Sequence, residues 1–180
     1  MAHRLTHLPF RPWCTTCIAA KAVDSPHYRL PVREDELEVV EFHYCYIQAD
    51  QATTLPALVS VTKKTGYGQA LVVKVKGRQD KNAVGATLRY LEEAGVTAKA
   101  RFRSDSEQSI RSFVQEVAKQ GGSETIIEVT PKASSSSLGA GECYIKRVMG
   151  TLRTLVAEFE AYWKRPFPVQ LLPHAVVYSA

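Results

Sequence analysis

The sequence predicts an α/β fold in which a mixed sheet is covered by helices. Three strand-like segments follow one another between residues 37 and 75 with short connections, which is typical of an antiparallel meander. After residue 80, strand-like segments alternate with segments whose apolar residues recur at helical spacing. With 45% hydrophobic and 23% charged residues, the 180-residue chain is ordinary for a globular protein, and we expect one domain plus a small appendage.

The meander is built from the most apolar part of the chain. Residues 37–47 form the first expected strand, and residues 55–62 form the second. The segment "KKTGYG" at 63–68 supplies a turn with glycine, and residues 67–75 ("YGQALVVKV") form the third strand. The short connections favour antiparallel pairing of all three.

Helical spacing begins in the segment 80–93, and Gly95 ends this helix. Its apolar positions are Val84, Leu88 and Leu91. Residues 97–103 ("TAKARFR") alternate in polarity and predict a fourth strand. This helix therefore separates the meander from a strand that must return to the same sheet.

A second helix is expected from about residue 105 to 119, ended by Gly121 and Gly122. Ser104 followed by Glu107 forms a capping-box pattern at its start. Its apolar residues are Ile110, Phe113, Val114 and Val117. The segment "TIIEV" that follows predicts the fifth strand, over residues 125–129.

The loop 130–141 ("TPKASSSSLGAG") is flexible by composition and leads into a long helix that Pro166 and Pro168 end. The apolar stripe of this helix consists of Val148, Leu152, Leu155, Val156, Phe159 and Tyr162. Residues 171–180 look like a further helix begun but cut short. The element order β β β α β α β α is shared by the ribonuclease H-like fold, with a mixed five-stranded sheet flanked by helices, and it also fits other α/β folds.

Two segments precede the core-like domain of residues 37–180. Residues 1–22 are rich in His, Cys and Pro, and residues 23–36 are polar and form an expected linker. The first segment contains an H-x3-H pair and a C-x2-C pair, formed by His3, His7, Cys14 and Cys17. Two histidines and two cysteines suit tetrahedral zinc. The alternative is an N-terminal tail whose cysteines pack as small hydrophobic residues.

The first strand carries a titratable group in its middle. In "VVEFHYCY", residues 39–46, side chains two apart lie on the same face, so Glu41, His43 and Cys45 share one face. The other face is formed by Val40, Phe42, Tyr44 and Tyr46. An apolar strand with a glutamate and a histidine on one face requires a functional or structural reason.

Two acidic residues lie where the carboxylates of a two-metal phosphoryl-transfer site would converge. Asp105 ends the fourth expected strand, and Glu142 opens the long helix. Magnesium prefers oxygen ligands, and two such ions clamp the attacking and leaving oxygens. Each acid also has a structural explanation, because a carboxylate near a helix N-terminus interacts favourably with the helix dipole.

A basic face follows Glu142 along the long helix. Lys146, Met149 and Arg153 lie four, seven and eleven residues after it, which places them on one side. Lys146 and Arg153 could contact DNA phosphates beside a metal at Glu142, and the alternative is a solvated amphipathic face. The net charge of +5 and the pI of about 9.0 lean weakly toward an anionic partner such as nucleic acid.

Several segments together resemble the integrase of copia-type retrotransposons. They are "HRLTHLPFRPWCTTCIAAK", "EVVEFHYCY", "KKTGYGQALVVKVKG", "RFRSDSEQSIRSFVQEVA" and "SSSSLGAGECYIKRVMGTLRTL". The similarity extends from His3 to Tyr178, and the HHCC spacing and the Arg-Ser-Asp context are its most specific parts. It implies a ribonuclease H-like core, an N-terminal zinc element, and an Asp-Asp-Glu triad with two divalent metals, magnesium or manganese, that joins element ends to target DNA.

Matched by position, the second acid of that triad is Asp105 and the third is Glu142, while His43 stands where the first aspartate belongs. A neutral imidazole offers one nitrogen and no negative charge, and it suits zinc or manganese better than magnesium. Glu41 shares the face but lies roughly 6.5–7 Å away along the strand. The resemblance therefore implies weak or absent DNA integration, with Lys146, Arg147 and Arg153 supplying contacts to the DNA backbone.

Further departures point the same way. The loop "SSSSLGAGEC" lacks the asparagine of the family and its basic residue after the glutamate, where Cys143 stands, and the chain stops at "LLPHAVVYSA". We therefore expect a decayed or partial element copy. Two other interpretations stay open: a nucleic-acid-binding module without chemistry, and an active manganese nuclease that uses His43 as ligand or general base.

The location and partners follow from what the chain contains. It has no run of 18 apolar residues, and the start "MAHRLTHLPF" lacks the apolar core of a signal peptide. We expect a nuclear or cytoplasmic protein that is not secreted, does not contact membranes and keeps its cysteines reduced. The expected partner is DNA, and the resemblance implies that the chain could form a homo-oligomer.

Overall fold

The computed structural model describes residues 13, 37–48, 54–122, 124–130 and 139–180. The fold reported below belongs to the second of the two units of the chain, Asp35–Ala180. The predicted zinc ligands His3, His7, Cys14 and Cys17, together with the linker 23–36, lie outside the described residues. No helix within the described ranges is long and apolar enough to cross a membrane.

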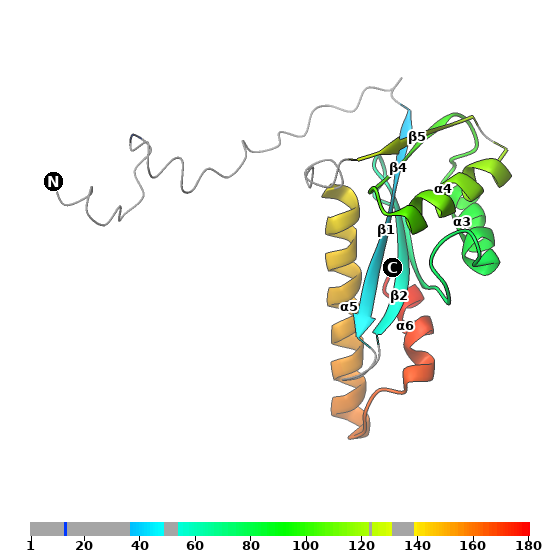
Figure 1. Cartoon of the computed structure of the whole chain (residues 1–180). Helices are drawn as coiled ribbons and strands as arrows, with labels where there is room; N and C mark the ends of the chain where they lie inside the picture. Colours follow the sequence, from blue (N-terminus) through cyan, green and yellow to red (C-terminus); the bar gives the residue numbers. More distant parts are fainter. Residues whose placement is uncertain (1–12, 14–36, 49–53, 123, 131–138) are drawn as a thin grey trace. The chain divides into compact units, whose positions relative to one another are not determined.

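The predicted mixed sheet of five strands is present (Figure 1). The strands are β1 (Glu38–Gln48), β2 (Thr54–Thr62), β3 (Gly68–Val72), β4 (Ala100–Ser104) and β5 (Thr125–Val129). Their order across the sheet is β3-β2-β1-β4-β5. The first three pair antiparallel as the short connections predicted, whereas β4 and β5 join in parallel after helical crossovers.

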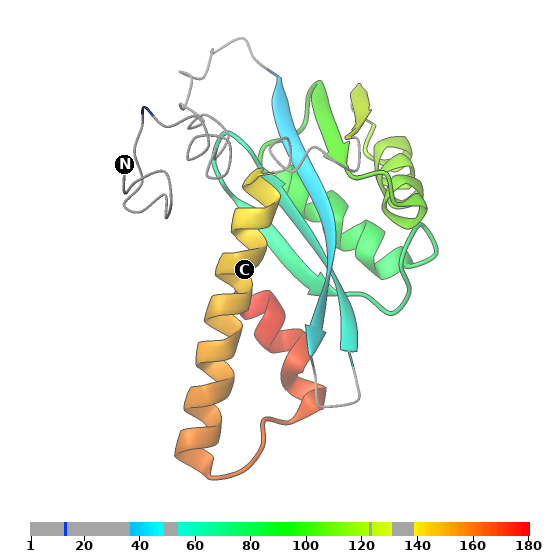
Figure 2. The same cartoon turned by 60° about the vertical axis from the view of Figure 1, so that its left-hand side comes forward.

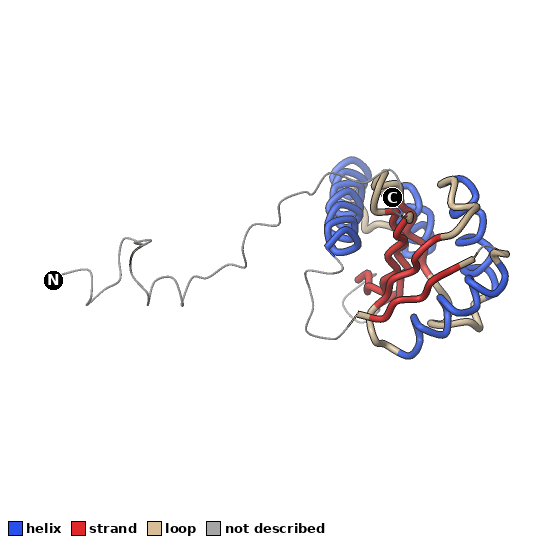
Figure 3. The backbone as a smooth tube through the Cα atoms, turned by 90° about the horizontal axis from the view of Figure 1, so that it is seen from above, coloured by secondary structure: helices blue, strands red, loops and turns tan. Residues whose placement is uncertain are grey.

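Helices cover both faces of this sheet (Figure 3). They are α3 (Lys81–Glu93), α4 (Gln108–Gln120), α5 (Gly139–Trp163) and α6 (Leu172–Tyr178), with a short 3-10 turn, η2 (Val169–Leu171), before α6. One core lies between the sheet and α3 and α4, and Phe42, Phe102 and Phe113 are fully buried in it. A second core lies between the other face and α5 and α6.

The two faces of β1 separate as period-two alternation predicts. Val40 and Phe42 enter the core under α3 and α4, and the rings of Phe42 and Phe102 meet edge to face with centroids 5.2 Å apart. The face that carries Glu41 and His43 is turned toward α5, which donates a backbone N–H to Glu41. Burial of one whole face fixes the register, because a slip of one residue would move Phe42 out of the core.

Several local expectations were wrong. The fourth strand covers Ala100–Ser104 and not 97–103, and α5 begins at Gly139, inside the expected loop 130–141. The third strand ends at Val72, before residue 75. The capping box does not form, because Ser104 is the last residue of β4 and α4 begins only at Gln108, with Glu107 as N-cap and no side-chain cap bond. The apolar stripe of α5 is buried at Val148 and Leu152 but not at its end, where the side chain of Tyr162 is 76% exposed.

Candidate active site

The middle of β1, the end of β4 and the first turn of α5 meet at one place. Strands β1 and β4 run parallel, and their last registered pair is Phe42 with Ser104, so His43 and Asp105 are the next positions along the two neighbouring strands. The first turn of α5 covers β1 at this level (Figure 2). The three positions singled out in the sequence are therefore carried by elements that converge.

Gly141 lies directly against the imidazole of His43. A Cβ atom added at Gly141 would be 2.1 Å from His43 Nε2 and 2.2 Å from Cδ2, so any larger residue requires the imidazole or the start of α5 to move. Both residues are buried, and His43 retains 8% of its surface. The imidazole consequently fills the space between β1 and the start of α5.

Glu41 ties the start of α5 to β1. Its side chain is 1% exposed, and the backbone N–H of Gly141 donates to Glu41 Oε2 at 2.8 Å. The same oxygen lies 4.0 Å from His43 Nε2. Gly141 belongs to the first turn of α5, whose N–H groups lack partners within the helix, so the carboxylate serves as a cap supplied by another element.

The far nitrogen of His43 is left without a hydrogen bond. His43 Nε2 is buried and has no hydrogen-bond partner within the described ranges. A buried polar atom without a partner is costly, by about 1–3 kcal/mol, so such an atom points to a functional or inherited constraint.

The two predicted acidic ligands are engaged elsewhere or face solvent. Asp105 is half-buried, and its Oδ1 accepts from the backbone N–H of Glu107 at 2.9 Å, a turn that aspartate favours. Glu142 is exposed on the first turn of α5. Within the part of the chain that the structure describes, no group of three or more His, Cys, Asp and Glu side chains could hold a metal ion.

These donors do not fit a centre of two magnesium ions. Such a centre requires converging carboxylate oxygens, and at its middle this chain presents an imidazole nitrogen wedged against Gly141. Glu41, the one buried carboxylate in the described part of the chain, already accepts the N–H of Gly141. The three elements therefore converge, while among the described residues no set of side chains that could hold two ions is assembled.

The predicted basic residues of α5 are available for an anionic partner. Lys146, Arg147 and Arg153 are exposed, and among the described residues none of them pairs with a carboxylate. Arg147 lies over the ring of Tyr144, 4.5 Å from its centroid, which orients the guanidinium. Seven residues separate Lys146 and Arg153, so they lie roughly 10 Å apart along the helix axis.

A cluster that the sequence analysis did not identify fixes the loop after Asp105. Lys76 Nζ lies 2.9 Å from Glu107 Oε1 and about equally far from two rings, 4.9 Å from the centroid of Tyr44 and 4.7 Å from that of Tyr46. Burial disfavours the charge of Lys76, but hydrogen bonds to Tyr46 and Glu107 outweigh it and raise its pKa. The sequence alternation that places Tyr44 and Tyr46 on one face of β1 could have indicated half of this cluster. Nothing in the sequence indicated that Lys76, which lies in a loop, would contact them.

Comparison with known proteins identifies the fold. No family model matches the sequence, and no curated protein matches it. Among solved structures, the integrase catalytic core domain of HTLV-2 in complex with magnesium, in its dimeric form, is similar with a TM-score of 0.54 and 10% identity, over 78% of this chain and 83% of that one. The trimeric form of the same domain gives a TM-score of 0.51 and 12% identity, over 78% and 82%.

A chain from a larger viral assembly is also similar in structure. A chain of the simian T-cell lymphotropic virus intasome, in complex with PP2A regulatory subunit B56 gamma, is similar with a TM-score of 0.54 and 16% identity over 91% of this chain. The chain spans 55% of the length of that viral chain. The protein described here has the ribonuclease H-like fold of retroviral integrase catalytic cores.

Proposed function

We propose that this chain is an integrase-like, DNA-binding domain of copia-type retrotransposon origin in which metal-dependent DNA integration is weak or absent. The observation that carries the proposal is the contact between His43 and Gly141, because an imidazole fills the position that a metal-bridging carboxylate would need. The exposed cations of α5, which pair with no carboxylate among the described residues, support DNA binding. The alternative, a nucleic-acid-binding remnant with no chemistry at all, differs only in the absence of any metal-dependent cleavage.

The proposal extends to residues and partners that still await a test. His3, His7, Cys14 and Cys17 would bind zinc, Asp105 and Glu142 would bind magnesium or manganese weakly, and the domain would act in the nucleus or cytoplasm as a homo-oligomer. A zinc assay on the purified full-length chain beside Cys14→Ser, Cys17→Ser measures the first of these. One equivalent of zinc in the wild type and none in the double variant is the expected result.

Chemistry is tested by nicking and joining of labelled DNA with magnesium or manganese, for the wild type beside His43→Asp. We expect no robust joining by the wild type. Gain of magnesium-dependent activity in His43→Asp, abolished again by Asp105→Asn, would support the inherited site. Robust turnover by the wild type that disappears on Asp105→Asn would overturn the impaired core and favour the manganese nuclease with His43 as ligand or base.

DNA binding is tested separately, by titrating a labelled duplex at several salt concentrations. Replacement of Lys146 or Arg153 by alanine should weaken binding uniformly across sequences and reduce the slope of log affinity against log salt by about one each. Lys119→Ala removes an exposed lysine at the end of α4 and is the matched control. No affinity for duplex DNA at low salt would contradict the proposal.

A further inference from the structure

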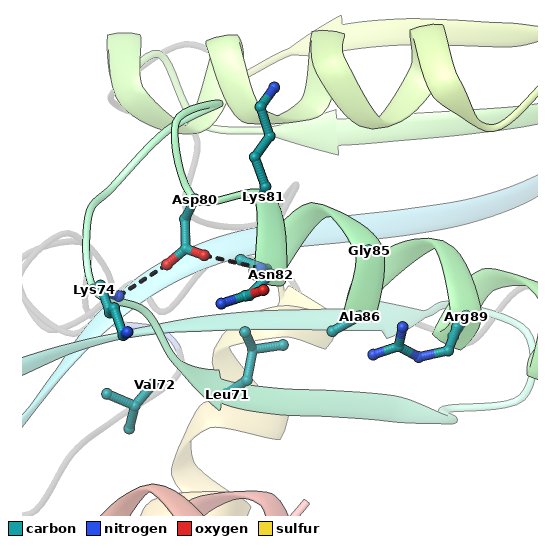
Figure 4. A pocket seen from close by; sticks show the side chains of 10 residues that line it. Leu71, Val72, Lys74, Asp80, Lys81, Asn82, Gly85, Ala86 and Arg89 are labelled. Carbon is teal, nitrogen blue, oxygen red and sulfur yellow. Dashed lines mark hydrogen bonds between the residues drawn. The ribbon is translucent and has the colours of Figure 1, made fainter.

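A groove of about 450 Å³ lies between strand β3 and helix α3 (Figure 4). Leu71 and Val72 of β3 form one side, and Gly85 and Ala86 of α3 form part of the other. Its volume is in the range of ligand-binding pockets, about 300–1,000 Å³. None of the candidate active-site residues lines it, and Glu41 and His43 face α5 on the opposite side of the sheet.

The charge of the groove is positive. Lys74, Lys81 and Arg89 line it, with Lys74 and Lys81 at one end and Arg89 at the other, and the side chain of Lys81 extends from the start of α3 toward α4 (Figure 4). Its one acid, Asp80, is occupied on both oxygens, since Oδ1 accepts from Ala83 N at 3.0 Å and Oδ2 accepts from Lys74 N at 2.9 Å. The surroundings therefore favour a ligand that carries negative charge.

The cations themselves are largely unengaged. Lys81 approaches Glu116 at 3.4 Å, but its side chain is 71% exposed. Lys74 and Arg89 are exposed and form no ion pair within the described ranges. Lys74 and Arg89 thus have no carboxylate partner in the part of the chain that the structure describes, and together with the exposed Lys81 they make the groove complementary to an acidic partner.

The groove also runs along an open sheet edge. Strand β3 is outermost in the described sheet. The N–H of Val73 donates to the carbonyl of Pro56 on β2, so in an antiparallel ladder the N–H and C=O of the neighbouring Val72 point away from β2, toward the edge. Such outward backbone groups are a template for an added strand.

Gly85 provides space at the centre of the groove wall. It lies inside α3, where glycine is unfavourable relative to alanine, and an added Cβ would meet only Arg89 Nη1, at 3.9 Å. No contact inside the described fold thus requires a glycine here. The missing side chain leaves room for an occupant of the groove to approach the helix.

We propose that this groove binds an extended acidic peptide, which adds to β3 as a further strand. Lys81 and Arg89 are eight residues apart on α3, roughly 12 Å along the axis. Two acidic residues at positions i and i+4 of a strand point to the same side and lie about 13 Å apart, which matches that separation. A peptide fits better than nucleic acid because only a polypeptide backbone can pair with the edge at Val72.

The test uses the full-length chain and a fluorescein-labelled peptide of alternating Thr and Val with Glu at two positions four residues apart. Fluorescence anisotropy at low salt should show binding. Arg89→Ala should weaken it about three- to fivefold, as expected for an exposed ion pair, while Lys119→Ala should leave it unchanged. Methylation of alternate backbone nitrogens of the peptide should weaken binding roughly tenfold, because strand pairing is lost.

A space-filling variant separates the groove from general electrostatics. Gly85→Leu fills the groove and should abolish peptide binding, while circular dichroism and DNA binding through α5 remain as in the wild type. Failure of the unmodified peptide to bind, or equal binding of the methylated peptide, overturns the proposal. Equal competition by an oligonucleotide of the same charge overturns it in favour of a general anion surface. Dissociation of an oligomer by Gly85→Leu with unchanged peptide affinity assigns the groove to a second copy of the chain.

Discussion

At the residue scale, three side chains define the centre of the candidate site. His43 fills the space in front of Gly141, and Glu41 holds the N–H of Gly141 from the same strand. The arrangement explains why an imidazole is tolerated in the interior: it packs against a glycine backbone beside a carboxylate 4.0 Å away. The same packing places an imidazole, and not a carboxylate, in front of the first turn of α5.

The contact between Gly141 and His43 predicts that Gly141→Ala destabilises the fold. The new Cβ would lie 2.1 Å from His43 Nε2, so the helix start or the imidazole must move, at a cost of about 1–3 kcal/mol. Urea unfolding measures this change. Gly139→Ala is the matched control, because no described residue lies within 4 Å of a Cβ at Gly139, and it should be close to neutral. Equal stability of the two variants would contradict the packing described here.

The hydrogen bond that Glu41 accepts from Gly141 leads to a second stability prediction. Glu41→Ala leaves the N–H of Gly141 buried without an acceptor, which should cost about 1–3 kcal/mol. Glu41→Gln keeps a side-chain oxygen and should lose less. If chemical denaturation ranks the two variants in the opposite order, the capping role of Glu41 is wrong.

At the scale of elements, the sequence predicts most of the architecture because period and spacing are strong signals there. The alternation in β1 and the helical spacing of Val84, Leu88 and Leu91 were sufficient for their elements. The start of α4 was missed because Asp105 and Ser104 compete for local hydrogen bonds, and the Asp105 turn displaces the capping box. The fit of His43 against Gly141 could not be predicted, since it depends on contacts between residues distant in the chain.

We expect opposite changes in stability when alanine replaces a glycine inside helix α3 and a glycine just after it. Gly85→Ala should stabilise the protein by about 0.5–1 kcal/mol, because the interior of α3 has room for the methyl group. Gly95→Ala should destabilise it by about 1–2 kcal/mol, because Gly95 has a φ of +73° just after the helix. Thermal unfolding of both variants measures the two signs. A loss of stability in Gly85→Ala would contradict the open space at that position.

The Lys76 cluster predicts a pH dependence. A hydrogen bond from Ser109, together with that of Lys76, lowers the pKa of Glu107 below its ordinary value of 4.5. A lowered pKa in the folded state means that the contribution is complete above about pH 4.5 and is lost as the pH falls through the folded pKa. Glu107→Gln should therefore reduce stability at neutral pH and converge with the wild type in acid, as followed by urea midpoints. A gap that persists in strong acid would contradict this assignment.

At the scale of the whole molecule, one sheet separates two cores with different roles. The core under α3 and α4 contains the fully buried phenylalanine rings of Phe42, Phe102 and Phe113, while the core under α5 and α6 lies on the face that carries Glu41 and His43. Tyr144 joins the latter elements, because its hydroxyl donates to the carbonyl of Ala180 at 2.5 Å. The basic surface of α5 and the groove beside α3 lie on opposite faces of the sheet, so DNA and a peptide would not compete for space.

The central core predicts the largest effect of any single substitution proposed here. Phe42→Ala should destabilise the protein by about 3–5 kcal/mol, because its ring is fully buried between those of Phe102 and Phe113. Tyr178→Ala removes an aromatic ring of similar size that is 78% exposed, and it should be nearly neutral. Equilibrium denaturation distinguishes them, and a small effect at Phe42 would contradict the packing of this core.

The close approach of Gly141 to His43 has an evolutionary consequence. Neither position can change freely while the other stays as it is, since any larger residue on the helix would collide with the ring on the strand. In related sequences the two positions should vary together. A larger side chain at position 141 should occur only where the side chain at position 43 is smaller than histidine. If related sequences show positions 43 and 141 varying independently, then the start of helix α5 can move away from strand β1 more readily than their contact implies.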